Sequence, residues 1–142
     1  MVYPGANVEP VWPEQKEHGV SRVDDRRGLG RRGEELAARH LAGRDYEIVA
    51  RNWRCEVGEI DLVARDGDWL AFVEVRTRRG RALGTPEESI TPAKQARLVD
   101  LAEAYVQMHD WPGYYRIDVI AVELDRRGRL LRVEHYENAV TG

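Results

Sequence analysis

The chain has 142 residues, enough for one domain with a buried core, and its 42% hydrophobic content is ordinary for a globular protein. A formal net charge of −3 excludes the strongly basic class of nucleic-acid-binding proteins, so any such partner must be argued from where the charges lie. The single cysteine, Cys55, excludes an internal disulfide, and no apolar run is long enough to span a bilayer. We therefore expect a soluble, cytoplasmic protein that does not bind membranes.

The predicted elements begin after a polar N-terminal segment. Residues 1–27 contain prolines and no sustained apolar period, which predicts a flexible tail before a folded domain over 28–142. A helix is predicted over about 30–42, where small and apolar residues recur at helical spacing and a glycine follows the last of them. Glu34 lies on the apolar stripe of this helix, together with Ala37, Ala38 and Leu41.

Five strands and a second helix complete the predicted domain. The strands are expected over 46–54, 58–65, 69–76, 115–124 and 130–136, and the helix over 92–108. Thr91 is a typical N-cap and Pro92 suits the first helical position, while a Gly- and Pro-containing loop over 79–90 precedes them. The order αβββαββ predicts a small α/β domain in which helices pack on a mixed central sheet.

Two of these strands form a predicted hairpin that brings carboxylates together. A tight turn at 67–68 places Asp61 opposite Glu74 and Glu59 opposite Arg76, and side-chain alternation puts all four on one face. The other face is expected to hold Ile60, Leu62, Ala64, Ala71, Val73 and Val75. Because directly opposed like charges are destabilising, a compensating positive group is expected, either a divalent metal or arginines.

Both forms of compensation are consistent with the hairpin. Asp61, Glu74 and the carbonyl of Val75 would supply oxygen ligands of the kind that Mg²⁺ or Mn²⁺ prefers. Such an ion would polarise a phosphoryl oxygen and help to generate hydroxide. The alternative is that Glu59 with Arg76, and Asp61 with a nearby arginine, form ordinary cross-strand ion pairs. The spacing of these residues is compatible with a bound metal and with ion pairs.

Further charges surround the hairpin. Glu34 and Lys94 each lie at a helix start on the core-facing stripe, so both can converge on the same place. A basic cluster leads out of the third strand and suits contacts to a phosphate backbone, although a solvated loop is the alternative. The cluster consists of Arg76, Arg78, Arg79 and Arg81, and Gln95 could hold a water or a phosphate nearby. Arg116 and Asp118 share one face of the fourth strand and predict a structural ion pair.

Several motifs together resemble the small bacterial YraN-like family of uncharacterised proteins, over about residues 28–125. They are Gly30-x-x-Gly33-Glu34, Asn52, Gly58-Glu59-Ile60-Asp61, Phe72-Val73-Glu74-Val75-Arg76-x-Arg78 and Arg116-x-Asp118. By similarity that family belongs to the restriction-endonuclease-like PD-(D/E)XK phosphodiesterases. The resemblance implies an αβββαβ nuclease-type core with a divalent metal at the acids: Glu34 matches the helix acid, Asp61 the second-motif aspartate and Glu74 the third-motif acid.

One position departs from the superfamily pattern. Where the pattern has lysine two residues after the acid, this chain has Arg76, which stays protonated and cannot act as a general base. Arg76 can still neutralise a phosphate through two hydrogen bonds. Lys94 would replace the missing ammonium if its helix start faces the carboxylates; otherwise it is a lysine at the edge of the core.

These observations predict a Mg²⁺- or Mn²⁺-dependent endonuclease acting on DNA, including branched or damaged forms. The first alternative is a non-catalytic nucleic-acid-binding module on the same fold, because Arg76 replaces the usual lysine. The second is a protein-interaction domain whose acids are only ion-paired. Related folds often pair to cut two strands, but nothing in the sequence marks an interface, so a homodimer stays open.

Overall fold

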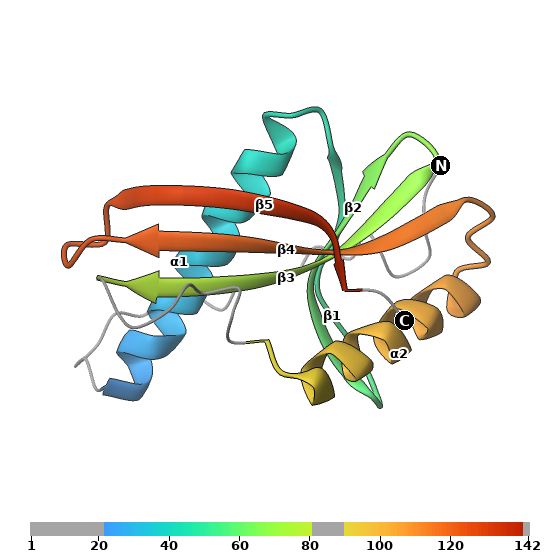
Figure 1. Cartoon of the computed structure of the whole chain (residues 1–142), viewed down its shortest axis with the longest axis horizontal. Helices are drawn as coiled ribbons and strands as arrows, with labels where there is room; N and C mark the ends of the chain where they lie inside the picture. Colours follow the sequence, from blue (N-terminus) through green and yellow to red (C-terminus); the bar gives the residue numbers. More distant parts are fainter. Residues whose placement is uncertain (1–21, 81–89, 141–142) are drawn as a thin grey trace.

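The computed structural model of the chain describes residues 22–80 and 90–140, with side chains from Arg27 onward (Figure 1). The elements are α1 (Arg22–Ala42), β1 (Glu47–Cys55), β2 (Gly58–Asp66), β3 (Trp69–Arg79), α2 (Pro92–Met108), β4 (Tyr114–Leu124) and β5 (Leu130–Val140). This order confirms the predicted succession αβββαββ and the mixed α/β class. Most of the predicted tail over 1–27, and Arg81, lie outside the described residues.

The five strands form one mixed sheet in the order β1-β2-β3-β4-β5. Strands β3 and β4 are parallel, and the other neighbouring pairs are antiparallel. Parallel neighbours need a crossover, which contains helix α2. Figure 1 shows α1 passing behind the sheet and α2 lying in front of it.

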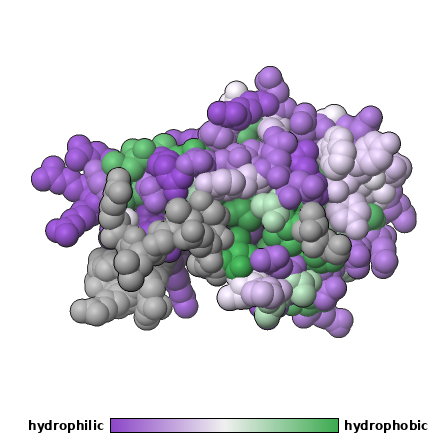
Figure 2. All heavy atoms as spheres, in the orientation of Figure 1, coloured by the Kyte–Doolittle hydropathy of each residue, from purple (hydrophilic) through white to green (hydrophobic). Residues whose placement is uncertain are grey.

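Each helix covers its own buried cluster. Helix α1 contributes Ala37, Ala38 and Leu41 to one cluster, and α2 contributes Leu98, Leu101, Ala102 and Tyr105 to the other. The three α1 residues are those of the predicted apolar stripe. The core therefore has two layers, one on each side of the sheet. On the face shown in Figure 2, hydrophilic residues form most of the surface. Across the described ranges, none of the helices has the length and apolar character needed to cross a membrane.

Helix α1 begins earlier than predicted. The expected start was near Gly30, but the helix begins at Arg22 and includes Gly28 and Gly30 in its interior. A glycine inside a helix costs only about 1 kcal/mol relative to alanine. That cost is too small to end a helix that continues into a well-packed segment, because helix propagation is cooperative.

At Gly33 helix α1 lies very close to strand β3. A Cβ atom built at this position would overlap Oγ1 of Thr77 on β3 and lie 2.8 Å from its Cβ. Thr77 is β-branched and cannot swing away as a long side chain would. Glycine at 33 therefore lets the next residue, Glu34, lie close to the strand.

We expect Gly33→Ala to destabilise the protein by about 1–3 kcal/mol, because overpacking forces side chains and backbone to shift. Gly30→Ala is the matched control, since an added Cβ there meets nothing within 4 Å. In the helix interior that control should be stabilising by roughly 0.5–1 kcal/mol. Urea unfolding of both variants measures the difference. Equal stabilities would show that α1 does not press on Thr77.

Candidate active site where strand β2 leaves strand β3

Strand β2 separates from β3 beside the predicted carboxylates. The two strands pair from Asp66↔Trp69 to Leu62↔Val73, which confirms the predicted hairpin register. Beyond that pair β2 continues with β1 alone, as far as Cys55↔Gly58. Figure 1 shows the β1–β2 hairpin descending steeply from the plane of β3, β4 and β5.

Asp61 lies at this point of separation. Its Oδ2 accepts a hydrogen bond of 2.8 Å from the backbone N–H of Val75 on β3. The carboxylate thus satisfies a donor next to the end of the strand ladder, as a buried N–H requires. The bend also overturns one prediction: Ile60 packs in the α2-side cluster, not with Leu62 and Ala64 on the α1 side. Strict alternation fails because the strand turns between Ile60 and Leu62.

Asn52 on β1 joins two further acids to the site. Its backbone is left-handed, with φ of 52°, a conformation that asparagine tolerates better than most residues. In the amide orientation that satisfies both its oxygen and its nitrogen, Asn52 donates to Glu34 Oε1 at 3.3 Å and to Glu59 Oε2 at 2.8 Å. Helix α1 and the β1–β2 hairpin therefore present their carboxylates to one another.

The crowding of acids raises their proton affinities. Burial, followed by the charge of Glu59, raises the pKa of Glu34 from its ordinary 4.5 to about 7, against hydrogen bonds with Asn52 and Asp61. Burial, followed by the charges of Glu74 and Glu34, raises the pKa of Asp61 well above its ordinary 3.8. A hydrogen bond between the carboxyls of Glu34 and Asp61 requires a shared proton. The cluster therefore favours an additional positive charge.

Two cations contact the most buried of these acids. Glu74 has a side chain only 5% exposed, and its Oε2 lies 3.3 Å from Nη1 of Arg76 and 3.6 Å from Nζ of Lys94. Thr91 accepts a 3.1 Å hydrogen bond from the N–H of Lys94, which confirms the predicted N-cap. The start of α2 therefore faces the carboxylates. This was the condition for Lys94 to replace the lysine that is absent from β3.

The predicted pairing of Glu59 with Arg76 is wrong. Glu59 forms its ion pair with Arg54 on β1, at 3.6 Å, while Arg76 contacts Glu74. The reason is again the bend: the β2–β3 ladder ends before these residues can face each other. Glu59 joins the acid cluster through Asn52, a role that strand alternation could not reveal.

The remaining predicted contacts to nucleic acid lie around this site. Arg78 is partly buried on β3, and Arg79 is exposed at its end. Gln95 uses its Nε2 to donate to the carbonyl of Ile90 at 3.3 Å, a contact within the chain. A role of Arg78, Arg79 and Gln95 in binding nucleic acid stays a prediction.

The donor chemistry of the cluster fits a hard divalent cation. Asp61 accepts from the N–H of Val75, and Glu74 is the residue before it; one or two carboxylates with waters is the usual protein share of a Mg²⁺ site. Within residues 22–80 and 90–140, no three His, Cys, Asp or Glu side chains are gathered as a ready-formed metal site. Any ion held here would therefore draw on backbone oxygen, water or a ligand as well.

Glu34 predicts a stability that depends on pH. Because its folded pKa is raised, its stabilising contribution is complete below about pH 4.5 and is lost as the pH rises through about 7. Glu34→Gln mimics the protonated form, so this variant should be more stable than the parent at pH 8, by roughly 1–3 kcal/mol, and similar at pH 4. Denaturant unfolding at the two pH values measures the gap.

Glu35→Gln is the matched control for that measurement. Glu35 is the next residue on α1 and is paired with Arg39 at 3.3 Å and with Arg51 at 3.0 Å. Removing its charge breaks favourable pairs, so Glu35→Gln should be less stable than the parent at pH 8. A loss of stability in Glu34→Gln at pH 8 would contradict the claim that the ionised form of Glu34 is destabilised by burial and by the neighbouring acids.

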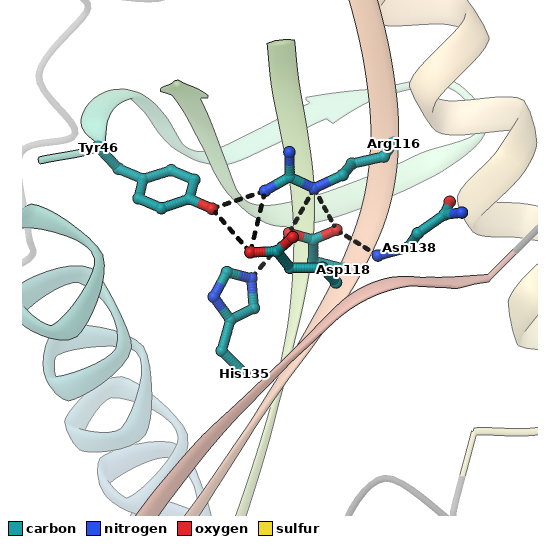
Figure 3. A network of polar contacts seen from close by, with 6 residues as sticks. Tyr46, Arg116, Asp118, His135 and Asn138 are labelled. Atoms are coloured by element: carbon teal, nitrogen blue, oxygen red, sulfur yellow. Dashed lines mark hydrogen bonds and ion pairs between the residues drawn. The ribbon is translucent and has the colours of Figure 1, made fainter. Parts of the chain in front are cut away.

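A second polar network involves Tyr46, Arg116, Asp118, His135 and Asn138 (Figure 3). The predicted pair is present: Nε of Arg116 lies 3.0 Å from Oδ1 of Asp118, which is completely buried. Asp118 also accepts from His135 Nε2 at 2.7 Å and from the N–H of Asn138 at 2.9 Å. Arg116 further donates to the hydroxyl of Tyr46 at 2.6 Å.

The sequence offered one signal for this larger network. Asp118 stands between apolar residues in a strand buried on both faces, and a buried charge needs several partners. Which residues those would be was not predictable, because His135 and Tyr46 come from distant segments.

The sequence model of the Uncharacterised protein family UPF0102 matches residues 33–122, which include Glu34, Asp61 and Glu74. A UPF0102 protein of Roseiflexus castenholzii is 56% identical over 115 residues, covering 79% of this chain and 92% of that protein. One from Pelotomaculum thermopropionicum is 51% identical over 118 residues, covering 82% and 98%. One from Streptomyces coelicolor is 48% identical over 120 residues, covering 82% and 92%. The resemblance to the YraN-like family is thereby confirmed at the level of the family.

Proposed function

This chain belongs to the Uncharacterised protein family UPF0102, and from its site we propose that it is a divalent-metal-dependent phosphodiesterase acting on DNA. The proposal includes a restriction-endonuclease-like fold, toward which the αβββαβ order and the mixed sheet point. The carrying observation is the meeting of Glu34, Asp61 and Glu74, from three elements, with Arg76 and Lys94. The three acids can bind a metal ion, and the two basic side chains beside them can bind a phosphate.

Each residue has a distinct part in this proposal. Asp61 and Glu74, with the carbonyl of Val75, would hold Mg²⁺ or Mn²⁺, which when bound polarises the phosphoryl oxygen and activates water. Arg76 and Lys94 would bind the phosphodiester and stabilise the charge that develops on it. Glu34 would orient an attacking water, since it is hydrogen-bonded to Asp61 and lies beside the cluster.

The test is cleavage of single-stranded, duplex and four-way-junction DNA with Mg²⁺ or Mn²⁺, with Asp61→Asn as the paired variant. We expect the parent protein to cut at least one substrate only when the metal is present. The four-way junction is included because branched DNA is among the predicted substrates. If neither protein cuts any substrate, the catalytic proposal is wrong.

The second candidate is a nucleic-acid-binding module without catalysis. Arg76 in place of lysine favours it, because a guanidinium stays protonated and cannot act as a general base, and both Arg76 and Lys94 are paired with Glu74. This candidate predicts DNA binding that weakens with salt, with no cleavage by the parent protein. A gain of cleavage in Arg76→Lys would identify a nuclease that has lost its activity at this position.

A further inference from the structure

The side chain of Glu74 is covered by its two cations. Its side chain is 5% exposed, whereas the side chains of Arg76 and Lys94 are 34% and 30% exposed. Both contact the same oxygen, Oε2, one from strand β3 and the other from the first turn of α2. The two cations therefore lie between the buried acid and the solvent.

A metal ion and these cations compete for the same carboxylate. A divalent ion at Glu74 would meet two positive charges within contact range of its ligand oxygen, and like charges this close repel strongly in a partly buried site. A phosphate group offers the cations another partner, because guanidinium and ammonium groups both bind phosphate oxygens. Arg76 and Lys94 have long, partly exposed stems, so they can turn to such a group without unfolding the strand or the helix.

We propose that the site works by exchange of ion pairs: a backbone phosphate of the nucleic acid draws Arg76 and Lys94 from Glu74, and the freed carboxylate then binds the metal. This inference rests on the proposed function and adds its regulation. Metal and nucleic acid bind cooperatively, and each is weak without the other. By linkage, the factor by which one ligand tightens the other is the same in both directions.

The test is a pair of titrations of the full chain. The Kd of Mn²⁺ is measured by calorimetry with and without a saturating short phosphorothioate oligonucleotide, which resists cleavage. The Kd of the oligonucleotide is then measured with and without Mn²⁺. We expect each ligand to tighten the other about 10-fold, within the usual range of coupling between sites. The oligonucleotide should tighten Mn²⁺ binding by the same factor by which Mn²⁺ tightens oligonucleotide binding, and this equality is an internal check on the two titrations.

A double variant, Arg76→Gln with Lys94→Gln, removes the competing cations. It should bind Mn²⁺ alone about as tightly as the parent binds it with oligonucleotide, and added oligonucleotide should no longer matter. Arg97→Gln with Arg126→Gln is the matched control, because it removes the same charge from exposed positions on α2 and in the β4–β5 turn. The control should keep the parent's coupling. If the double variant does not fold, Lys94→Gln should still show reduced coupling.

The possible results distinguish a failure of the ion-pair exchange from a failure of the proposed nuclease function. A parent protein that cuts DNA with Mn²⁺, but binds Mn²⁺ equally well with and without oligonucleotide, overturns the exchange and leaves the nuclease intact. Equal gains in Mn²⁺ affinity in the double variant and the control would also overturn it, because net charge would then explain the effect. A parent that binds no Mn²⁺ under either condition overturns both.

Discussion

Asp61→Asn is expected to lower metal-dependent DNA cleavage by at least about 100-fold, because even partners outside a metal's own ligands commonly contribute 10- to 100-fold. The same variant should stay folded. An asparagine oxygen can still accept the N–H of Val75, which Asp61 holds at 2.8 Å. It also removes a charge from a site where Glu34 and Glu74 repel it. Stability at pH 8 should therefore be unchanged or higher.

Lower cleavage together with unchanged or higher stability would distinguish a metal-binding acid from a structural one. Cleavage assays give the first quantity, and urea unfolding without metal gives the second. Asp100→Asn is a suitable control, since Asp100 is exposed on α2 and outside the acid cluster. If Asp61→Asn loses stability along with activity, Asp61 is a structural acid. If it keeps the parent's cleavage rate, the site lies elsewhere.

Asp118→Ala is expected to lower the free energy of unfolding by about 3–5 kcal/mol, the cost of breaking a buried ion pair from one side. Asp118 is fully buried, and removing it leaves the guanidinium of Arg116 and the ring of His135 without their shared acceptor. The N–H of Asn138 also loses its partner. Figure 3 shows these donors converging on the carboxylate from β4 and β5.

Asp118→Asn is the graded control for this prediction, because it keeps the shape and one acceptor oxygen while removing the charge. It should fall between the parent and Asp118→Ala when both are unfolded in urea. Cleavage by the folded fraction should match the parent, because Asp118 contacts Arg116, His135 and Asn138 and not the acids of the candidate site. A loss below about 1 kcal/mol for Asp118→Ala would show that the network contributes little net stability.

Features set by neighbouring residues were predictable. The hairpin register follows from a tight turn at 67–68 and from side-chain alternation, and Leu62↔Val73 confirms it. The start of α2 follows from Thr91 and Pro92, whose capping chemistry acts within one turn. The charge of Glu74 acts on Asp61, so the two acids lie near each other as the register led us to expect, although the β2–β3 ladder ends one pair earlier, at Leu62↔Val73.

Features that join distant segments were not predictable. Asn52 meets Glu34 and Glu59 only because α1 lies against the bent β1–β2 hairpin. Ile60 changed faces at the same bend.

The order of elements, the hairpin and the helix cap were thus encoded locally, by turn residues, periodicity and capping groups that act over a few positions. The partners of each charge were decided by how the finished sheet curves and which helix covers it. Lys94 could be placed at a helix start from the sequence, but its contact with Glu74 required α2 to pack on the side of the sheet opposite α1. Proton affinities belong to the second group, because burial and the charges of remote segments, not the residue type, raise the pKa of Glu34 to about 7.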